Sequence, residues 1–303
     1  MTSRGAPDRV GPWSLQRAVG RAGELHAASG RLLEGAGPGG RIVRVLHAER
    51  PAVVLGAAQP GSDVDAGRAA RLGVDIARRR SGGGAVLVGP GESLWVDVAI
   101  PRGDPLWSDD VGTAMAWIGE AWVSALDAVG AGPAERWAGR LVSSPWSDKV
   151  CFAGVGPGEV LRPPAGAAGS PAGVAGSPAG RPQAPSAAAA RPTPPPPARR
   201  PGVPFAGRGL LGPKVVGISQ RRTRAGALFQ TAALLRWRPL DLLDVLVMEP
   251  AERARAADQL AGVAQAVGGA RSCGGAAAGE LLDAFLGALP PGAQHGGAAI
   301  RLP

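Results

Sequence analysis

A short run of arginine and glycine residues has the clearest potential for chemistry in this sequence. From Arg78 to Ala85 it reads Arg-Arg-Arg-Ser-Gly-Gly-Gly-Ala, between two apolar stretches. Because three consecutive glycines carry no Cβ, their backbone N–H groups can approach an anion or a carboxylate closely. The neighbouring guanidinium groups add positive charge and forked donors. The run predicts an anion- or carboxylate-binding loop, and a solvent-exposed hairpin loop with solubilising arginines is the alternative.

A lysine and a cysteine further along the chain are the other candidates for chemistry. Lys214 begins the β-type run Lys-Val-Val-Gly-Ile-Ser, from which its ammonium could reach a carbonyl or a phosphate. Cys151 precedes Phe152, and a thiolate stabilised by a nearby lysine can accept an acyl group from a thioester. The structural alternatives are an exposed strand lysine and a small buried cysteine.

The glycine run and the lysine run together resemble the signatures of the lipoate-protein ligase A family, which includes the related cysteine-dependent octanoyltransferases. The first run is similar to the family's Arg-Arg-x-Ser-Gly-Gly-Gly signature, and residues 212–220 are similar to its Gly-x-Lys-[Ile/Val]-x-Gly-x-[Ala/Ser]-Gln signature. Gly56 with Gln59, and residues 226–231, lie where the family has further pocket segments. The resemblance extends over about residues 14–245 once an insertion is omitted.

The resemblance implies covalent attachment of a lipoyl or octanoyl group to the lysine of a lipoyl domain. The leading hypothesis is a lipoate-protein ligase that uses ATP and Mg²⁺ to convert lipoate or octanoate into an acyl-adenylate. The alternative is an octanoyltransferase that takes the octanoyl group from acyl carrier protein, forms a Cys151 acyl-enzyme and needs no cofactor. A non-catalytic paralogue that binds a lipoyl domain or an acyl carrier is a third hypothesis. A biotin-protein ligase ranks lower, because its loop has a Gly-Arg-Gly-Arg pattern.

The same resemblance implies the site residues and the partners. Lys214 is the expected catalytic residue, and Cys151 joins it only in a transferase. The expected partners are lipoyl domains of 2-oxoacid dehydrogenase complexes or the glycine-cleavage H protein, with acyl carrier protein as a possible donor. The residues expected to bind the acyl or adenylate group are Arg78, Arg79, Ser81, Gly82, Gly83, Gly84, Ala85, Gln59, Gly217 and Ser219.

Three places in the sequence differ from the family pattern. The family continues the glycine motif into His-Asp, where this chain has residues 88–90, Val-Gly-Pro. Gln230 stands in place of the family's usual histidine, and ATP-using ligases carry an Asn-Asp pair near residues 147–149, which are Ser-Asp-Lys here. These differences weigh against nucleotide chemistry. Cys151-Phe152, in contrast, is close to the Cys-Phe-x-x-Pro context of the octanoyltransferases.

The apolar patterns predict the elements that position these residues. The fold class is α/β, with a mixed, largely antiparallel sheet flanked by helices, similar to the biotin/lipoate ligase catalytic domain. Residues 41–46 and 52–56 are predicted to form a hairpin around a Glu-Arg-Pro turn. The other predicted strands are 74–79, 85–88, 93–100, 150–153, 159–161, 214–219 and 227–235, and the predicted helices are 14–33, 62–72, 109–129, 240–247, 250–267 and 279–289.

Composition divides the chain and limits its function classes. Residues 14–161 and 210–245 are predicted to form a discontinuous catalytic domain, and residues 246–303 a helical extension. Between them, residues 162–209 are predicted to be a disordered Pro/Ala/Gly-rich insertion with 13 of the 30 prolines. Six arginines and no acid in this insertion account for most of the net charge of +9, which argues against nucleic-acid binding by the folded part. An Arg/Pro-rich docking segment is the alternative for the insertion.

Targeting and metal signals are absent from the sequence. No apolar run reaches the length of a membrane span, and the first residues lack an apolar signal core. We therefore expect a cytoplasmic protein without membrane contact. The three histidines, His26, His47 and His295, have no second ligand at metal-binding spacing, so we expect no metal site built by the protein alone.

Overall fold

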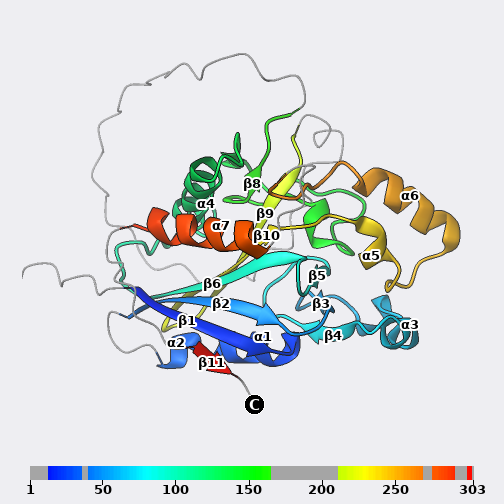
Figure 1. Cartoon of the computed structure of the whole chain (residues 1–303), viewed down its shortest axis with the longest axis horizontal. Coiled ribbons are helices and arrows are strands. Elements are labelled where there is room, and N and C mark those ends of the chain that lie inside the picture. The colour runs from blue at the N-terminus through cyan, green and yellow to red at the C-terminus, as the bar shows by residue number, and fades with distance from the viewer. Residues whose placement is uncertain (1–12, 36–39, 165–210, 269–274, 291–298, 302–303) are drawn as a thin grey trace, which may run out of the picture.

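The structure is a computed structural model that describes residues 13–35, 40–164, 211–268, 275–290 and 299–301. Figure 1 shows these residues as two layers of sheet with helices on the outside. The predicted insertion 162–209 lies outside the described residues except for its first three positions, so its predicted disorder stays a prediction. The predicted division of the chain into domains also stays a prediction.

An eight-stranded sheet forms the body of the molecule. Strand β1 runs parallel to β11 and β2, and every other neighbouring pair in the sheet is antiparallel. This topology confirms the predicted mixed, largely antiparallel sheet. In spatial order the strands are β11 (Ala299–Arg301), β1 (Trp13–Gly20), β2 (Arg41–Ala48), β6 (Ser93–Pro101), β10 (Gly226–Leu234), β9 (Lys214–Arg222), β8 (Val160–Leu161) and β7 (Glu135–Arg136).

A second sheet of three short strands carries the glycine loop. Strand β3 (Ala52–Leu55) lies in its centre, parallel to β4 (Asp75–Arg78) and antiparallel to β5 (Val86–Val88). All four residues of β3 are buried, as expected for a central strand covered on both faces. The loop from Ser81 to Ala85 therefore joins the two outer strands and passes the end of β3. It is not the turn of a simple hairpin.

The predicted hairpin between residues 41–46 and 52–56 is wrong. Both strands exist, but β2 pairs with β1 and β6, whereas β3 belongs to the small sheet. The turn at residues 49–51 carries the chain from one sheet to the other. A turn signal gives the position of a bend, and it does not give the partner of the strand that follows.

Two other predicted elements also differ from the structure. The predicted helix 14–33 begins as strand β1, followed by α1 (Ala22–Gly30) and α2 (Leu32–Gly35). Trp13 and Leu15 are buried on either side of exposed Ser14, which is the two-residue period of a strand. The predicted strand 150–153 is a single bridge, from Val150 to Ala85, followed by the 3₁₀ turn η2 (Cys151–Ala153).

Helices cover the sheets and close the core. Helices α4 (Ala116–Ala128) and α7 (Gly275–Ala288) pack against each other, with the rings of Trp122 and Phe285 stacked at 4.1 Å. Helix α4 begins seven residues later than predicted, and its aromatic residues lie in the core as expected. The small sheet packs against α5 (Pro239–Leu243) and α6 (Pro250–Leu260), while η1 (Gly61–Asp63) and α3 (Ala66–Arg71) lie beyond its edge.

Within the described residues, no helix is both long enough and apolar enough to cross a bilayer. The same residues contain no group of three or more His, Cys, Asp or Glu side chains arranged to hold a metal ion.

A buried ion pair connects Arg41, at the start of β2, to Asp104, in the turn that follows β6. Arg41 Nε lies 2.8 Å from Asp104 Oδ2, and the two side chains are 2% and 3% exposed. Arg41 also lies over the Trp13 ring. Because Asp104→Ala leaves a buried guanidinium without its counter-charge, we expect the free energy of unfolding to fall by about 3–5 kcal/mol in urea titrations. Glu120→Ala breaks the exposed pair with Arg136 and should cost less than about 1 kcal/mol; equal losses would contradict this expectation.

Candidate functional site

The Arg79 guanidinium holds the glycine loop in place. Its Nη1 donates to the Val54 carbonyl at 3.1 Å, and its Nη2 donates to the carbonyls of Gly82 and Gly84 at 2.7 and 2.8 Å. The side chain is buried. A buried guanidinium whose donors are used by backbone carbonyls acts first as a structural cross-link. The predicted contact of Arg79 with an anion stays a prediction.

Arg78 plays a similar part on the neighbouring loop. Its Nη1 donates to the carbonyls of Gly56 and Gln59 at 2.8 and 2.5 Å. Gln59 in turn donates from Nε2 to the Lys149 carbonyl at 3.3 Å. Arg78 and Gln59 thus connect the loop after β3 to the segment that leads to Cys151. The predicted anion contact of Arg78 is likewise untested.

The glycines of the loop have separate reasons to be glycine. A Cβ on Gly84 would lie 2.4 Å from the Val150 nitrogen, and a Cβ on Gly56 would lie 1.8 Å from the Gly83 carbonyl oxygen. Gly83 has a φ of +95°, which favours glycine. Ala85 exchanges backbone hydrogen bonds with Lys149 and Cys151, at 2.9 and 2.8 Å. The loop is therefore fixed against residues 147–151, and Gly82 and Gly83 face an open cavity.

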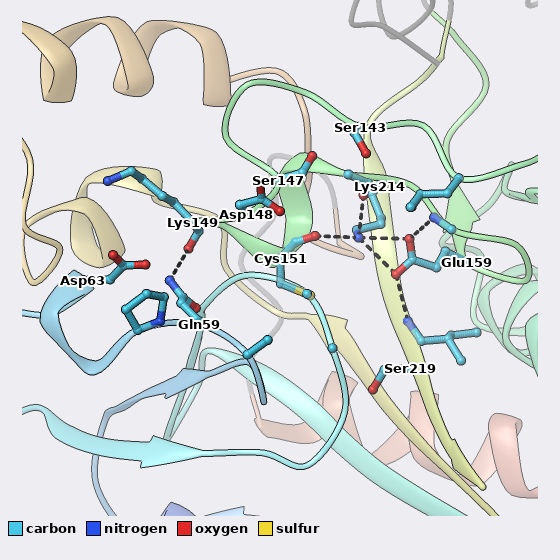
Figure 2. A pocket seen from close by; sticks show the side chains of 18 residues that line it. Gln59, Asp63, Ser143, Ser147, Asp148, Lys149, Cys151, Glu159, Lys214 and Ser219 are labelled. Atoms are coloured by element: carbon cyan, nitrogen blue, oxygen red, sulfur yellow. Dashed lines mark hydrogen bonds and ion pairs between the residues drawn. The ribbon is translucent and has the colours of Figure 1, made fainter. Parts of the chain in front are cut away.

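Lys214 forms a buried ion pair with Glu159. Its Nζ lies 3.1 Å from both carboxylate oxygens of Glu159 and also donates to the carbonyls of Cys151 and Gly154, at 3.1 and 2.8 Å. The two side chains are 1% and 7% exposed, and Nζ lies 4.6 Å from the centre of the Phe152 ring. Figure 2 shows the pair beside Cys151. The predicted alternative of an exposed strand lysine does not describe this residue.

Cys151 lies where two cavities meet. It lines a wide cavity of about 880 Å³ together with Gly82, Gly83 and Lys214. It also lines a second, narrower and mostly apolar cavity. Arg79 Nη2 lies 3.8 Å from the sulfur. Cys151 is half-buried and not in a disulfide, and it lies in the wall of both cavities.

The two cavities differ in character. The wide one carries three carboxylates, from Asp63, Asp148 and Glu159, and two ammonium groups, from Lys149 and Lys214. The narrow one is lined mainly by apolar side chains from β5, β6 and β9 and from η2, with Gly217, Ser219 and Arg79 also at its wall. Gly217 lies against the Phe152 ring, 3.1 Å from where its Cβ would be. The narrow cavity is small, about 50 Å³, with a mostly apolar wall, whereas the wide one carries charged groups.

A polar network is buried in the wall of the narrow cavity. Ser219 Oγ bonds to Ser81 Oγ at 3.0 Å, and Ser81 Oγ donates to Gln230 Oε1 at 3.2 Å. Gln230 Nε2 then lies 3.3 Å from His26 Nδ1 and 3.2 Å from Asp97 Oδ2. Ser81 and Ser219, both predicted to bind the acyl or adenylate group, are thus brought together across the two sheets.

Burial shifts both titratable groups of this network toward their neutral forms. It raises the pKa of Asp97 to about 6, against the opposing hydrogen bonds from Gln230 and Trp95. It also lowers the pKa of His26 to about 3, with a further contribution from the Arg79 charge. Around neutral pH His26 is therefore an uncharged imidazole. Its ring centre lies 4.4 Å from that of Trp95, with the two planes tilted by 40°.

A family model, the lipoyl protein ligase A/B catalytic domain, matches residues 26–150. The matched segment is similar to this catalytic domain. It includes the whole glycine loop and ends one residue before Cys151. No curated protein sequence matches the chain.

Solved structures of lipoate-protein ligases share the fold. A bi-partite lipoate protein ligase of Thermoplasma acidophilum, described with its E2 lipoyl domain, is 16% identical over 96% of this chain and 88% of its own, with a TM-score of 0.64. A putative lipoate protein ligase from T. acidophilum with bound lipoic acid and a lipoate-protein ligase A bound with ATP are each 17% identical over 96% of this chain and 89% of theirs, with TM-scores of 0.58 and 0.57.

Most of the predicted site residues line the two cavities or contact residues that do, and their roles stay predictions. Three titratable residues of the same region were not predicted. Glu159, Asp97 and His26 were not predicted, because each is a lone titratable residue in an apolar stretch. For Glu159, the available signal was a carboxylate directly before the short strand that pairs with the lysine strand. Nothing in the sequence pairs Asp97 with Gln230, since the two meet only through the register of β6 and β10.

The packing of the glycine loop gives a matched pair of variants. Gly84→Ala places a methyl group on the Val150 nitrogen, whereas a Cβ on Gly82 meets nothing within 4 Å. We expect Gly84→Ala to lower the free energy of unfolding by about 1–3 kcal/mol, as overpacking does, and Gly82→Ala to be neutral. Urea denaturation measures both, and a Gly84→Ala protein as stable as wild type would contradict the tight docking.

The raised pKa of Asp97 predicts a pH-dependent stability. Between about pH 4 and 6 the folded protein keeps a proton on Asp97 that the unfolded chain releases, so stability falls as the pH rises through this range. Asp97→Asn removes this dependence. The difference in the free energy of unfolding between wild type and Asp97→Asn should therefore change by about 3 kcal/mol between pH 4 and pH 6. His26 acts in the opposite direction in both proteins and cancels in the difference. A flat difference curve from urea titrations at several pH values would refute the shift.

Proposed function

We propose that this protein attaches a lipoyl or octanoyl group to the lysine of a lipoyl domain. The family of residues 26–150 supports this reaction, and so does the pairing of an apolar cavity with a polar one at a single thiol. A lipoyl domain is the proposed acceptor, because one structure of the same fold is described with its E2 lipoyl domain. The glycine-cleavage H protein is a further proposed acceptor, since it presents the same target lysine.

The position of Cys151 favours acyl transfer through a thioester. Its sulfur is at the junction of the two cavities, where the carboxyl carbon of an acyl chain held in the narrow cavity would lie. A nucleophile at that point divides the transfer into two easier steps. The donor in this proposal is an acyl thioester, such as that of an acyl carrier protein.

The two steps balance as thioester exchange and aminolysis. The Cys151 thiolate attacks the donor thioester, a new S–C bond forms, and the carrier thiolate leaves and takes up a proton. The neutral amine of the target lysine then attacks the Cys151 thioester, forms the amide and releases the Cys151 thiolate, while the proton lost by nitrogen goes to solvent or to that sulfur. Lys214 fixes the turn that carries the nucleophile, through the Cys151 and Gly154 carbonyls, and Arg79 supplies positive charge beside the sulfur.

A lipoate-protein ligase is the second candidate, supported by the structures of this fold that bind lipoic acid and ATP. It would need a place for a triphosphate and Mg²⁺ in the wide cavity. There, however, three carboxylates outnumber two ammonium groups, and both lysines already face a carboxylate. These residues fit a triphosphate poorly.

Mass spectrometry of a lipoyl domain tests the function. The protein is incubated with the domain and either octanoyl-acyl carrier protein, or octanoate or lipoate with ATP and Mg²⁺. We expect a mass increase of one octanoyl group with the carrier-protein donor. An increase only with ATP would favour the ligase, and none under any condition would favour a protein that binds lipoyl domains or acyl carriers without catalysis.

Replacing the thiol separates the two enzyme classes. With Cys151→Ser we expect the carrier-protein reaction to fall at least about 100-fold, because the serine hydroxyl is a far weaker nucleophile without a general base. Cys273→Ser is the matched control and should keep wild-type activity. The acyl-enzyme should also be visible as a mass increase of wild-type protein that Cys151→Ser lacks. Unchanged transfer by Cys151→Ser would refute the thioester route.

A further inference from the structure

The Lys214 ammonium has more acceptors than hydrogens. An ammonium carries three donors, and four oxygens lie within 3.1 Å of Nζ: two from Glu159 and the carbonyls of Cys151 and Gly154. The side chain is 1% exposed. An anion entering the wide cavity can therefore gain a hydrogen bond from Lys214 only by displacing one of these partners.

The Glu159 carboxylate is itself fixed. Besides the lysine, Oε2 accepts from the Gly156 nitrogen at 2.7 Å and Oε1 accepts from the Ile218 nitrogen at 3.1 Å. Two backbone donors and an ammonium hold both carboxylate oxygens in this orientation. The Glu159 carboxylate is therefore fixed beside the Lys214 ammonium in the wall of the wide cavity.

The other lysine of the cavity gives a built-in comparison. Lys149 Nζ lies 4.0 Å from Glu252 Oε1, and both side chains are about one-third exposed, at 32% and 29%. Solvent screens such a pair, and it opens at little cost. The Lys214 pair is shorter and almost fully buried, so its mutual neutralisation is much stronger.

We propose that Glu159 determines the class of acyl donor by cancelling the charge of Lys214. A phosphate or phosphoanhydride donor is negatively charged, so it gains no attraction from the neutral Lys214–Glu159 pair and is repelled by the other carboxylates of the cavity. An acyl thioester is uncharged, so its binding does not require a free positive charge. The inference rests on the proposed acyl transfer and names the donor class: uncharged thioesters are accepted and nucleotide-activated acids are excluded.

Anion binding tests this directly, without any turnover. Isothermal titration calorimetry measures the binding of pyrophosphate, and of ATP with and without Mg²⁺, to wild type and to Glu159→Gln in the same buffer. Glu159→Gln keeps the shape of the side chain and frees the lysine charge. We expect pyrophosphate affinity to rise about tenfold or more, the effect of one uncompensated charge at contact distance.

Two controls assign the gain to the buried pair. Glu252→Gln removes the same unit of charge from the exposed pair and should change pyrophosphate affinity less than about threefold. Lys214→Met added to Glu159→Gln should abolish the gain.

The outcomes separate this inference from the proposed function. Equal pyrophosphate affinities of wild type and Glu159→Gln, or the same gain in Glu252→Gln, would overturn the role of Glu159 even if the wild type transfers acyl groups normally. If Glu159→Gln does not fold, wild type alone decides: submillimolar binding of ATP or pyrophosphate overturns the inference, and absence of binding supports it. Failure of wild type to acylate a lipoyl domain bears on the proposed function alone.

Discussion

The site depends on the guanidinium of Arg79, which binds three backbone carbonyls in two segments of the chain. It binds the carbonyl of Val54 in the central strand of the small sheet and two carbonyls of the glycine loop, and it lies beside the Cys151 sulfur. Three glycines alone would leave the loop with many conformations. The buried charge selects one of them, because any other arrangement leaves the guanidinium without acceptors. Arg79 was predicted to bind an anion, but in the structure its guanidinium hydrogen-bonds to backbone carbonyls of the protein itself.

The fixed position of the glycine loop also fixes residues 147–151, which pack against it. The loop fits against residues 147–151 so closely that Gly84 has no room for a side chain, and this contact fixes where the chain turns at Cys151. From the other side Lys214 holds the same turn through its carbonyls. The thiol is therefore placed by two cations, one from each sheet, that act on the backbone around it. Its position is a property of both sheets together.

The sequence predicted the fold class and the central loop well because both leave local signals. Alternating apolar residues and the glycine run could be recognised without knowing their neighbours, and β9 and β10 form where expected. Errors arose where partners decide the outcome. Strands β2 and β3 separate into different sheets, and the segment at Val150 makes one bridge and then turns. Glu159, Asp97 and His26 could not be found for the same reason: a carboxylate or an imidazole becomes informative only when the tertiary structure supplies its partner.

Glu159 and Lys214 are far apart in the sequence, but the antiparallel pairing of β8 and β9 brings them together. The two residues are 55 positions apart, and 46 of those positions, residues 165–210, lie outside the described ranges. Glu159 directly precedes β8, and Lys214 is the first residue of β9, which pairs antiparallel with β8. Next to this pairing, Arg162 donates its backbone N–H to the Pro213 carbonyl. Without the intervening segment the pair would be an ordinary short-range contact of a β-hairpin. The contact between Glu159 and Lys214 therefore depends on the pairing of β8 with β9 and not on the number of residues between them.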